Sequence, residues 1–149
     1  MARDRAQGAD DLEMTVWIER HDLSRENLED PSMDSFVSTL QTVDWQAEAR
    51  LEEEAKRLGK DCCPAGMGII HSGGQILHII PGDESNFRCH YHFPVRQRKI
   101  LGIFGATTRM ETLSFEHLEK KDLLAVIQAH YRGNHATVMN RLAQTATRI

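Results

Sequence analysis

The sequence predicts an α+β fold with an N-terminal helix, a four-stranded antiparallel sheet made of two hairpins, and two C-terminal helices. A helical apolar stripe runs over residues 34–58, strand-like runs joined by turns fill 67–113, and helical periodicity returns after 114. Strands joined by hairpins and followed by helices are typical of a sheet with helices on one face. We therefore expect one α+β domain over 34–149.

Composition is that of an ordinary globular chain: 149 residues, of which 40% are hydrophobic and 27% charged. No apolar run approaches the roughly 20 residues of a membrane span, and no apolar signal core is visible near the first residue. Three cysteines, an odd number, do not suggest a secreted disulfide framework. We expect a soluble cytoplasmic protein with no membrane partner.

Charge is unevenly distributed, with a net −8 over residues 1–66 and +4 over 67–149. The acidic part could lie against a basic sheet, or each part could meet a partner of opposite sign, although two solvated surfaces are the commoner outcome. A pI near 6.0 lacks the basic footprint of phosphate contacts, so nucleic acid is not an expected partner.

Residues 1–33 are acidic and hold little core material, so we expect a flexible N-terminal segment. Its exception is Met14–Ile18, which could form a short added strand or pack one Trp onto the body. From Asp34 the apolar stripe begins, with Ser32 or Asp34 as its cap and Gly59 at its end. The stripe consists of Phe36, Leu40, Val43, Ala47, Leu51, Ala55 and Leu58, with a kink possible near 42–44.

The first predicted hairpin joins 67–72 to 75–80 through Gly73 and Gly74, because both central positions of a primed two-residue turn need a positive φ. The third strand, 87–93, alternates between two faces. After a basic turn over 94–99, a fourth strand is predicted over 100–113. On the third strand Phe87, Cys89, Tyr91 and Phe93 share one face, and Arg88, His90 and His92 share the other.

Two helices complete the predicted fold. Ser114 is expected to cap a helix that runs to about Arg132, and Gly133 to end it. Asn134 is expected to cap the last helix.

The only constellation with metal-binding potential is His90-x-His92, because residues two apart on a strand point the same way. A two-residue turn would pair Ser72 with Gln75 and place His71 and His78 on one face of the hairpin. If that were also the face of His90 and His92, four imidazoles would line one surface. The implied cofactor is a transition metal such as zinc, although structural histidines are the commoner explanation.

Enzymatic signatures are absent from the sequence: it has no Gly-rich phosphate loop, no Gly-x-Ser-x-Gly and no His-Glu-x-x-His. A cysteine nucleophile is not favoured, because Cys62 and Cys63 follow a helix C-terminus and Cys89 falls on an apolar strand face. The leading hypothesis is therefore a non-catalytic binding or protein-interaction module for an unknown protein or small ligand. Its expected contacts are Arg88, His90, His92, Arg96, Arg98 and Tyr131. The alternatives are a metal-binding protein centred on His90 and His92, and a structural or homo-oligomeric protein.

Overall fold

A computed structural model describes residues 13–82, 86–97 and 107–146. The described chain forms a six-stranded antiparallel sheet, in the order β2-β1-β3-β4-β5-β6, and four helices. The elements are β1 (Met14–Glu19), β2 (Arg25–Asn27), α1 (Met33–Thr42), α2 (Trp45–Arg57), β3 (Gly66–His71), β4 (Ile76–Pro81), β5 (Asn86–Gln97), β6 (Thr107–Glu119), α3 (Lys120–Tyr131) and α4 (His135–Ala146).

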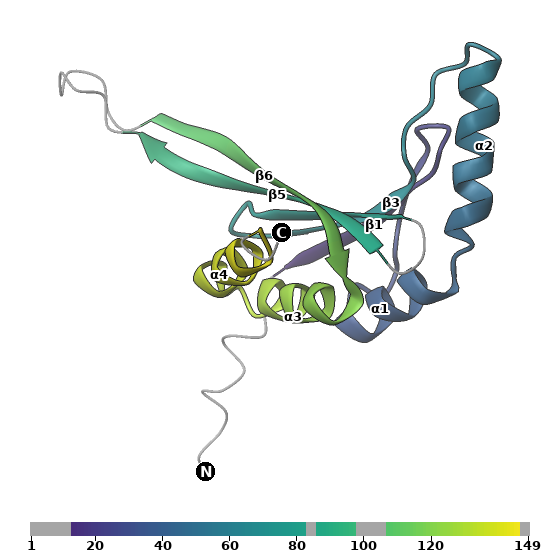
Figure 1. The fold of residues 1–149 in the computed structure, drawn as a ribbon. Helices are drawn as coiled ribbons and strands as arrows, with labels where there is room; N and C mark the ends of the chain where they lie inside the picture. The colour runs from purple at the N-terminus through teal and green to yellow at the C-terminus, as the bar shows by residue number, and fades with distance from the viewer. Residues whose placement is uncertain (1–12, 83–85, 98–106, 147–149) are drawn as a thin grey trace.

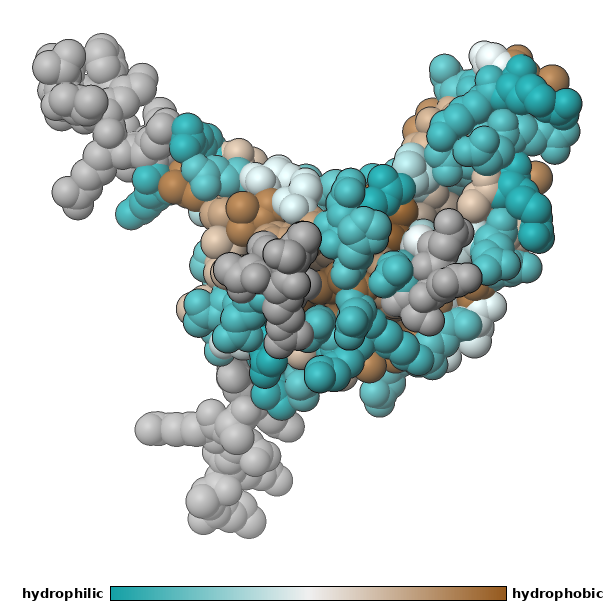
Figure 2. Space-filling model, viewed as in Figure 1, coloured by the Kyte–Doolittle hydropathy of each residue, from teal (hydrophilic) through white to brown (hydrophobic). Residues whose placement is uncertain are grey.

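Helices α1, α3 and α4 lie together on one side of the sheet, which we call the helix face (Figure 1). On the opposite side, the open face, no helix of the described residues packs flat against the sheet (Figure 1). Helix α2 stands up beside this open face, and the ends of β5 and β6 project on the other side of it (Figure 1). The space-filling view shows the resulting hollow between two projecting arms (Figure 2).

The α+β class is confirmed, but the sheet has six strands where the sequence analysis expects four. The additional strands are β1 and β2, which extend the sheet beyond β3. Val16 and Ile18 of β1 are buried in the core, and Trp17 is only 8% exposed. Residues 14–19 and 25–27 of the segment 1–33 therefore belong to the sheet, and the three consecutive apolar residues of β1 fill both of its faces.

The expected N-terminal helix is divided into α1 and α2. Val43 is extended, and the Asp44 side chain accepts a hydrogen bond from the Ala47 N–H at 3.0 Å, which starts a new helix. Ser32 caps α1 by accepting from the Ser35 N–H. Gly59 has a φ of 69° just past α2, as its expected role as a helix stop requires.

The predicted register of the first hairpin is wrong by one residue. His71 donates its N–H to the Gln75 carbonyl at 3.3 Å, and the Gly74 N–H donates to the His71 carbonyl. Gly74 has a φ of 87°. The loop therefore contains three residues, and Gly68 pairs with His78. A one-residue shift moves a side chain to the other face of a strand. His71 consequently lies on the helix face, and His78 lies on the open face.

Strand β6 continues through the region where the sequence analysis expects a helix start at Ser114. It reaches Glu119, and α3 begins at Lys120. Cys89 of β5 pairs with Phe115 of β6, whereas Phe87 of β5 pairs with Leu118. A step of two residues along β5 thus matches a step of three along β6, so β6 contains one extra residue there. His117, with a φ of 62°, occupies this bulge. The bulge returns Leu118 to the helix face, where it is fully buried.

The core lies between the sheet and helices α1, α3 and α4. The predicted inner face of β5 is confirmed, since Cys89, Tyr91 and Phe93 are all buried. Asn134 caps α4 by accepting from the Thr137 N–H at 3.1 Å, as predicted. No helix in the described ranges is both long enough and apolar enough to cross a membrane. The core side chains include Met67, Ile69, Leu77, Ile79, Leu123, Val126, Ile127, Val138 and Leu142.

Candidate functional site

Side chains of the open face line up in rows across the sheet, because antiparallel strands place paired residues on the same side. One row passes from Trp17 through Gly68, His78 and His90 to Ser114. The next row runs through Thr15, Ile70, Ile76, His92 and Thr112. Three histidines from two adjacent strands thus meet at the centre of the open face.

The three imidazoles of His78, His90 and His92 stack in a line. The ring centroids of His78 and His90 are 6.1 Å apart, and those of His90 and His92 are 6.4 Å apart, with interplanar angles of 24° and 26°. The Nδ1 atom of His90 hydrogen-bonds the Ser114 Oγ at 2.9 Å, and that of His92 hydrogen-bonds the Thr112 Oγ1 at 2.7 Å. These hydroxyls orient both rings and leave each Nε2 available to a ligand.

The surroundings favour the neutral form of His78 and of His92. Burial lowers the pKa of His78, the nearby Glu19 carboxylate opposes that shift, and His90 and His92 add to it. Burial also lowers the pKa of His92, and the charge of a protonated His90 lowers it further. An anion placed over the row would favour the charged forms and reverse these shifts.

A groove of about 460 Å³ crosses the open face beside the histidines. Ile70 and Ile76 are among its lining residues, as are His78 and His92. Trp17 also lines this groove. Its indole covers Gly68 so closely that a Cβ at position 68 would lie 2.1 Å from the ring. The Arg25 guanidinium lies 4.8 Å from the centre of that indole, in a cation–π contact on the edge of the groove.

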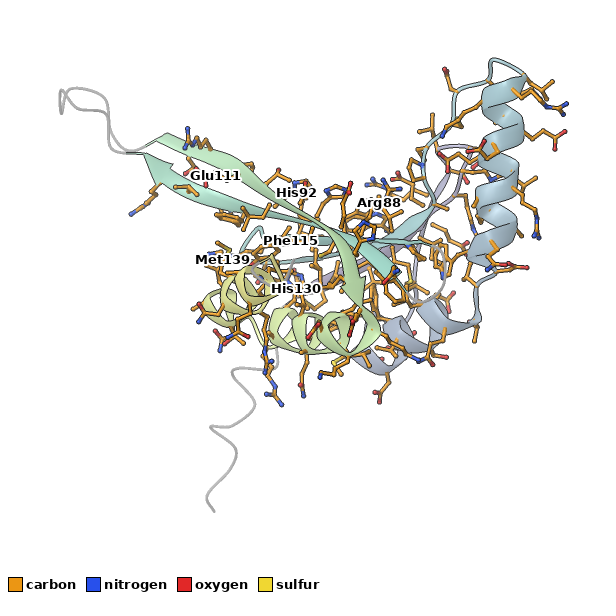
Figure 3. The ribbon with its side chains drawn as sticks, viewed as in Figure 1. Arg88, His92, Glu111, Phe115, His130 and Met139 are labelled. Carbon is orange, nitrogen blue, oxygen red and sulfur yellow. The ribbon has the colours of Figure 1, made fainter. Side chains whose placement is uncertain are left out.

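Arg88 and Arg96 extend the line of imidazoles on β5, one at each end. Arg88 and Arg96 occupy the same alternating positions as His90 and His92, so they lie on the open face. Both are exposed, and neither guanidinium makes a hydrogen bond or ion pair with another described residue. Arg88 and His92 can be seen on the side of the sheet away from His130 (Figure 3).

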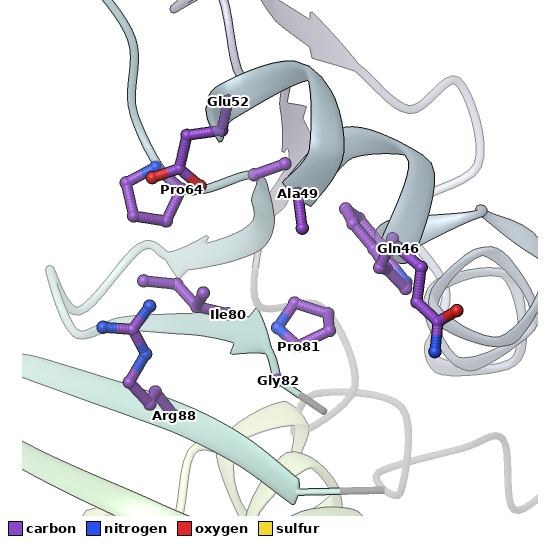
Figure 4. Close-up of a pocket in the computed structure, with 10 residues that line it drawn as sticks. Gln46, Ala49, Glu52, Pro64, Ile80, Pro81, Gly82 and Arg88 are labelled. Carbon is purple, nitrogen blue, oxygen red and sulfur yellow. The ribbon is translucent and has the colours of Figure 1, made fainter. Parts of the chain in front are cut away.

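Arg88 also borders a smaller cleft of about 200 Å³ between α2 and the sheet. Figure 4 shows Glu52 on the α2 wall and Arg88 on the β5 wall, with Pro64 and Ile80 between them. Glu52 already holds Lys56 at 2.9 Å, so its charge is partly satisfied within α2. The Arg88 guanidinium remains the unpaired charge of this cleft among the described residues.

The structure brings together four of the six expected contact residues: Arg88, His90, His92 and Arg96. Tyr131 lies elsewhere, on α3, where its hydroxyl donates to the Pro31 and Ser32 carbonyls. Arg98 falls outside the described residues.

The expected surface of four imidazoles does not form, because His71 lies on the helix face. There its ring is 4.9 Å from that of the buried His130. His78, His90 and His92 remain together, but their rings stack side by side and do not converge on one point. Within the described residues, no group of three or more His, Cys, Asp or Glu side chains could hold a metal ion as they are arranged. A transition-metal site on His90 and His92 stays a prediction.

Cys63 and Cys89 lie in surroundings that keep their thiols protonated. Burial raises the pKa of Cys89 to about 12. Burial also raises the pKa of Cys63, and a hydrogen bond to the Glu19 carboxylate acts in the same direction. Neither thiol has the depressed pKa of an activated nucleophile.

Sequence reasoning missed the contributions of Trp17, Arg25, Thr112 and Ser114 to this surface. Trp17 and Arg25 come from strands that the pattern did not establish. Thr112 and Ser114 were assigned near the end of a strand and the start of a helix. The available signal for a strand through residue 115 was an alternation of two sets of residues. One set is Thr108, Met110, Thr112 and Ser114, and the other is Arg109, Glu111, Leu113 and Phe115.

Comparison of the chain with known protein families, with curated proteins and with solved structures finds no match. The function must therefore be argued from the open face itself.

Proposed function

We propose that the protein is a non-catalytic binding module whose open sheet face holds an extended acidic segment of a partner protein. The observation that carries this proposal is the line of Arg88, His90, His92 and Arg96 along β5. Among the described residues, α1, α3 and α4 cover the other face of the sheet and α2 stands beside the Arg88 end of the line, so a partner could reach the line directly (Figure 1).

The chemistry of the line supports an anionic partner. The two guanidiniums are donors without acceptors among the described residues, and each can bind a carboxylate in a bidentate manner. The imidazoles of His90 and His92 are fixed at Nδ1 by hydroxyls, so Nε2 is the atom that can meet a ligand. Glu19, the nearest carboxylate to the groove, is already held by Arg25 at 2.8 Å.

The spacing of the line supports an extended peptide. Side chains on one face of a strand repeat about every 6.8 Å, and an extended peptide has the same repeat. A segment that lies along β5 with acidic residues at alternate positions would therefore match Arg88, His90 and His92 in register. The apolar groove floor at Ile70 and Ile76 would accept an apolar side chain of the same segment.

The test is fluorescence anisotropy with a labelled seven-residue peptide of alternating Glu and Thr, compared with a Gln-for-Glu version. We expect the acidic peptide alone to bind, with affinity falling as salt is raised. The Arg88→Gln/Arg96→Gln variant should lose at least tenfold in affinity, since two charge-assisted contacts are removed.

The matched control is Lys121→Gln/Arg132→Gln, which removes one exposed positive charge from α3 and one from the residue that follows it. This control should retain the affinity of the unchanged protein. Equal losses in both double variants would reduce the effect to net charge and overturn the proposal. Equal binding of the Glu and Gln peptides would also overturn it.

A further inference from the structure

The two edges of the sheet are protected to very different degrees. Strand β2 has three residues, whereas β6 has 13. An exposed edge strand offers unpaired backbone N–H and C=O groups to other chains, and proteins usually blunt it with proline, lysine or a bulge. In β6 the bulge at His117 is near the body, and the stretch 107–114 contains neither proline nor lysine.

The alternation of backbone groups identifies what this edge presents. In an antiparallel ladder both the N–H and the C=O of a residue point to the same neighbouring strand, and consecutive residues alternate. Gly82 donates to the Asn86 carbonyl, so even-numbered residues of β5 bond to β4 and odd-numbered ones bond to β6. Pro94, which has no N–H, pairs with Met110 and agrees with this alternation. The β6 residues of the stretch 107–114 whose backbone faces outward are therefore Thr108, Met110, Thr112 and Ser114.

The outward groups of Thr108 and Met110 lie where the sheet narrows to two strands, in which Phe93 is buried and Val95 packs against the core. Beyond His92, β5 has no partner on the β4 side, so residues 93–97 and 107–111 form a two-stranded ribbon, the β5–β6 arm. Isolated two-stranded ribbons are marginally stable in water. No backbone hydrogen bond links residues 107–112 to any described residue outside β5. Met110 on this arm is 51% exposed.

We propose that two copies of the chain pair through the outer edges of β6, antiparallel, with Met110 opposite Met110 of the second copy. This register places Arg109 opposite Glu111 of the second copy, and Glu111 opposite its Arg109. It also pairs Thr108 with Thr112 of the other strand. Opposite charges and β-branched residues are favourable cross-strand pairs.

The symmetric registers centred on the residues next to Met110, and on Thr112, are disfavoured by the same side chains. A pairing centred on Arg109 or on Glu111 would place like charges directly opposite each other, which is destabilising. A pairing centred on Thr112 would set Glu111 against Leu113 and Arg109 against Phe115. The side chains of Arg109 and Glu111 contact each other at 2.6 Å, so they lie on the same face of the arm. They are 56% and 39% exposed, so both can also be reached by a second copy.

The complementarity of the strand with itself favours a second copy over an unrelated strand as the occupant. An isologous contact of this kind closes as a twofold dimer and cannot propagate into a fibre. It would add about six backbone hydrogen bonds, centred on Met110. Because one strand pair is smaller than the interface of a stable dimer, we expect a dissociation constant in the micromolar range. This inference is independent of the proposed acidic ligand.

Sedimentation velocity of the full chain from about 1 to 200 μM tests this pairing across the expected range. The unchanged protein should pass from monomer to dimer. Arg109→Glu and Glu111→Arg should each stay monomeric at least tenfold higher in concentration. An equimolar mixture of the two variants should dimerise again, because every position 109 then meets an opposite charge at position 111.

The matched control is Arg132→Glu, which reverses an exposed charge at the C-terminal end of α3, outside β6, and should leave the dimer unchanged. A monomer at every concentration would overturn the inference. A dimer that both charge reversals leave intact would also overturn it, because another surface would then hold the copies together.

A cross-linking experiment tests the register itself. Met110→Cys places two thiols opposite each other at a Cα separation of about 5.5 Å, within disulfide range. Thr112→Cys would face Thr108 of the second copy and should not cross-link to itself. We expect mild oxidation to form covalent dimers with Met110→Cys only. Equal cross-linking by the two variants, or none by Met110→Cys, would contradict the register.

Discussion

His130 shows how a single buried side chain can make the fold sensitive to acid. It is 1% exposed, and its Nε2–H donates to the Ile69 carbonyl at 3.1 Å. Its Nδ1 is buried without a partner among the described residues, so a second proton there would have no acceptor. Burial lowers the pKa of His130 to about 4, and the neighbouring His71 contributes to this shift.

The pH dependence of stability follows from this shift. Between pH 6.5 and about 4 the unfolded chain binds a proton at this position that the folded chain does not. The His130 contribution is therefore complete above pH 6.5 and is lost as the pH falls toward 4, with a maximum of about 3 kcal/mol. We expect urea unfolding midpoints to drop steeply across this range.

The variant His130→Gln checks the assignment, since its amide can still donate to the Ile69 carbonyl but does not titrate. The difference in unfolding free energy between pH 7.5 and 5 should shrink in this variant. His117→Asn is the control, because His117 is exposed and Asn tolerates its positive φ. An unchanged pH dependence in His130→Gln would show that other groups govern acid unfolding.

Gly68 is a second position at which one residue determines a local arrangement. The Trp17 indole occupies the space that a Cβ at position 68 would need. We expect Gly68→Ala to displace the ring and to cost about 2 kcal/mol of unfolding free energy. A double-mutant cycle with Trp17→Leu measures the effect, and the cost should fall by at least half in the Leu background. Additive costs would mean that the clash lies elsewhere.

At the scale of secondary-structure elements, α2 is unusual because it has no fully buried residue. A helix of 13 residues is marginal on its own. Its main tertiary anchor is Glu48, which accepts hydrogen bonds from the His21 backbone N–H at 3.1 Å and from Arg20 at 3.3 Å, and contacts the His21 ring at 2.7 Å. This carboxylate joins α2 to the turn between β1 and β2.

Glu48→Ala should therefore loosen α2 while leaving the sheet intact. We expect the amides of α2 to exchange with solvent faster by a factor that corresponds to about 2 kcal/mol, with little change in β3 and β4. Glu53→Ala is a matched control on the same helix. The Glu53 side chain is 79% exposed, and its carboxylate approaches Lys56 no closer than 4.0 Å. Equal effects of the two variants would refute the anchoring role of Glu48.

How far the sequence predicted the elements depended on whether local signals agreed with tertiary pairing. The alternation of β5 was correctly read because the helix face and the open face of 87–93 differ sharply in polarity. The first hairpin was misassigned because both of its faces are apolar, so a shift of one residue left no trace in the pattern. His71 and His78 were therefore placed together although they lie on opposite faces.

Strands β1 and β6 were misjudged for other physical reasons. β1 lies far along the chain from β3, and its pairing depends on a long-range contact that a local pattern does not contain. In β6 the bulge at His117 breaks the alternation, and Ser114 resembles a helix cap although it pairs with His90. The candidate site was predicted along β5, whereas the contributions of neighbouring strands depended on these pairings.

At the scale of the whole molecule, the sheet separates two groups of histidines that respond to acid in opposite ways. His71 and His130 lie on the helix face, where a charge destabilises the fold. His78, His90 and His92 lie on the open face, where a charge would strengthen binding of an acidic partner. Burial lowers the pKa of His78, His92 and His130 alike.

Binding of the acidic peptide should therefore become tighter as the pH falls from 7.5 to about 5.5, by about tenfold, because the bound anion favours protonated imidazoles and raises their pKa. Glutamate side chains stay ionised in this range. Loss of the fold through His130 sets the acid limit, so circular dichroism must accompany each titration.

The variant His78→Gln/His90→Gln/His92→Gln should bind with an affinity independent of pH, through the arginines alone. His130→Gln should keep the pH dependence of binding while its fold tolerates acid better. An affinity that stays flat or falls with acid while the fold is intact would show that the open-face histidines do not meet the partner's charges.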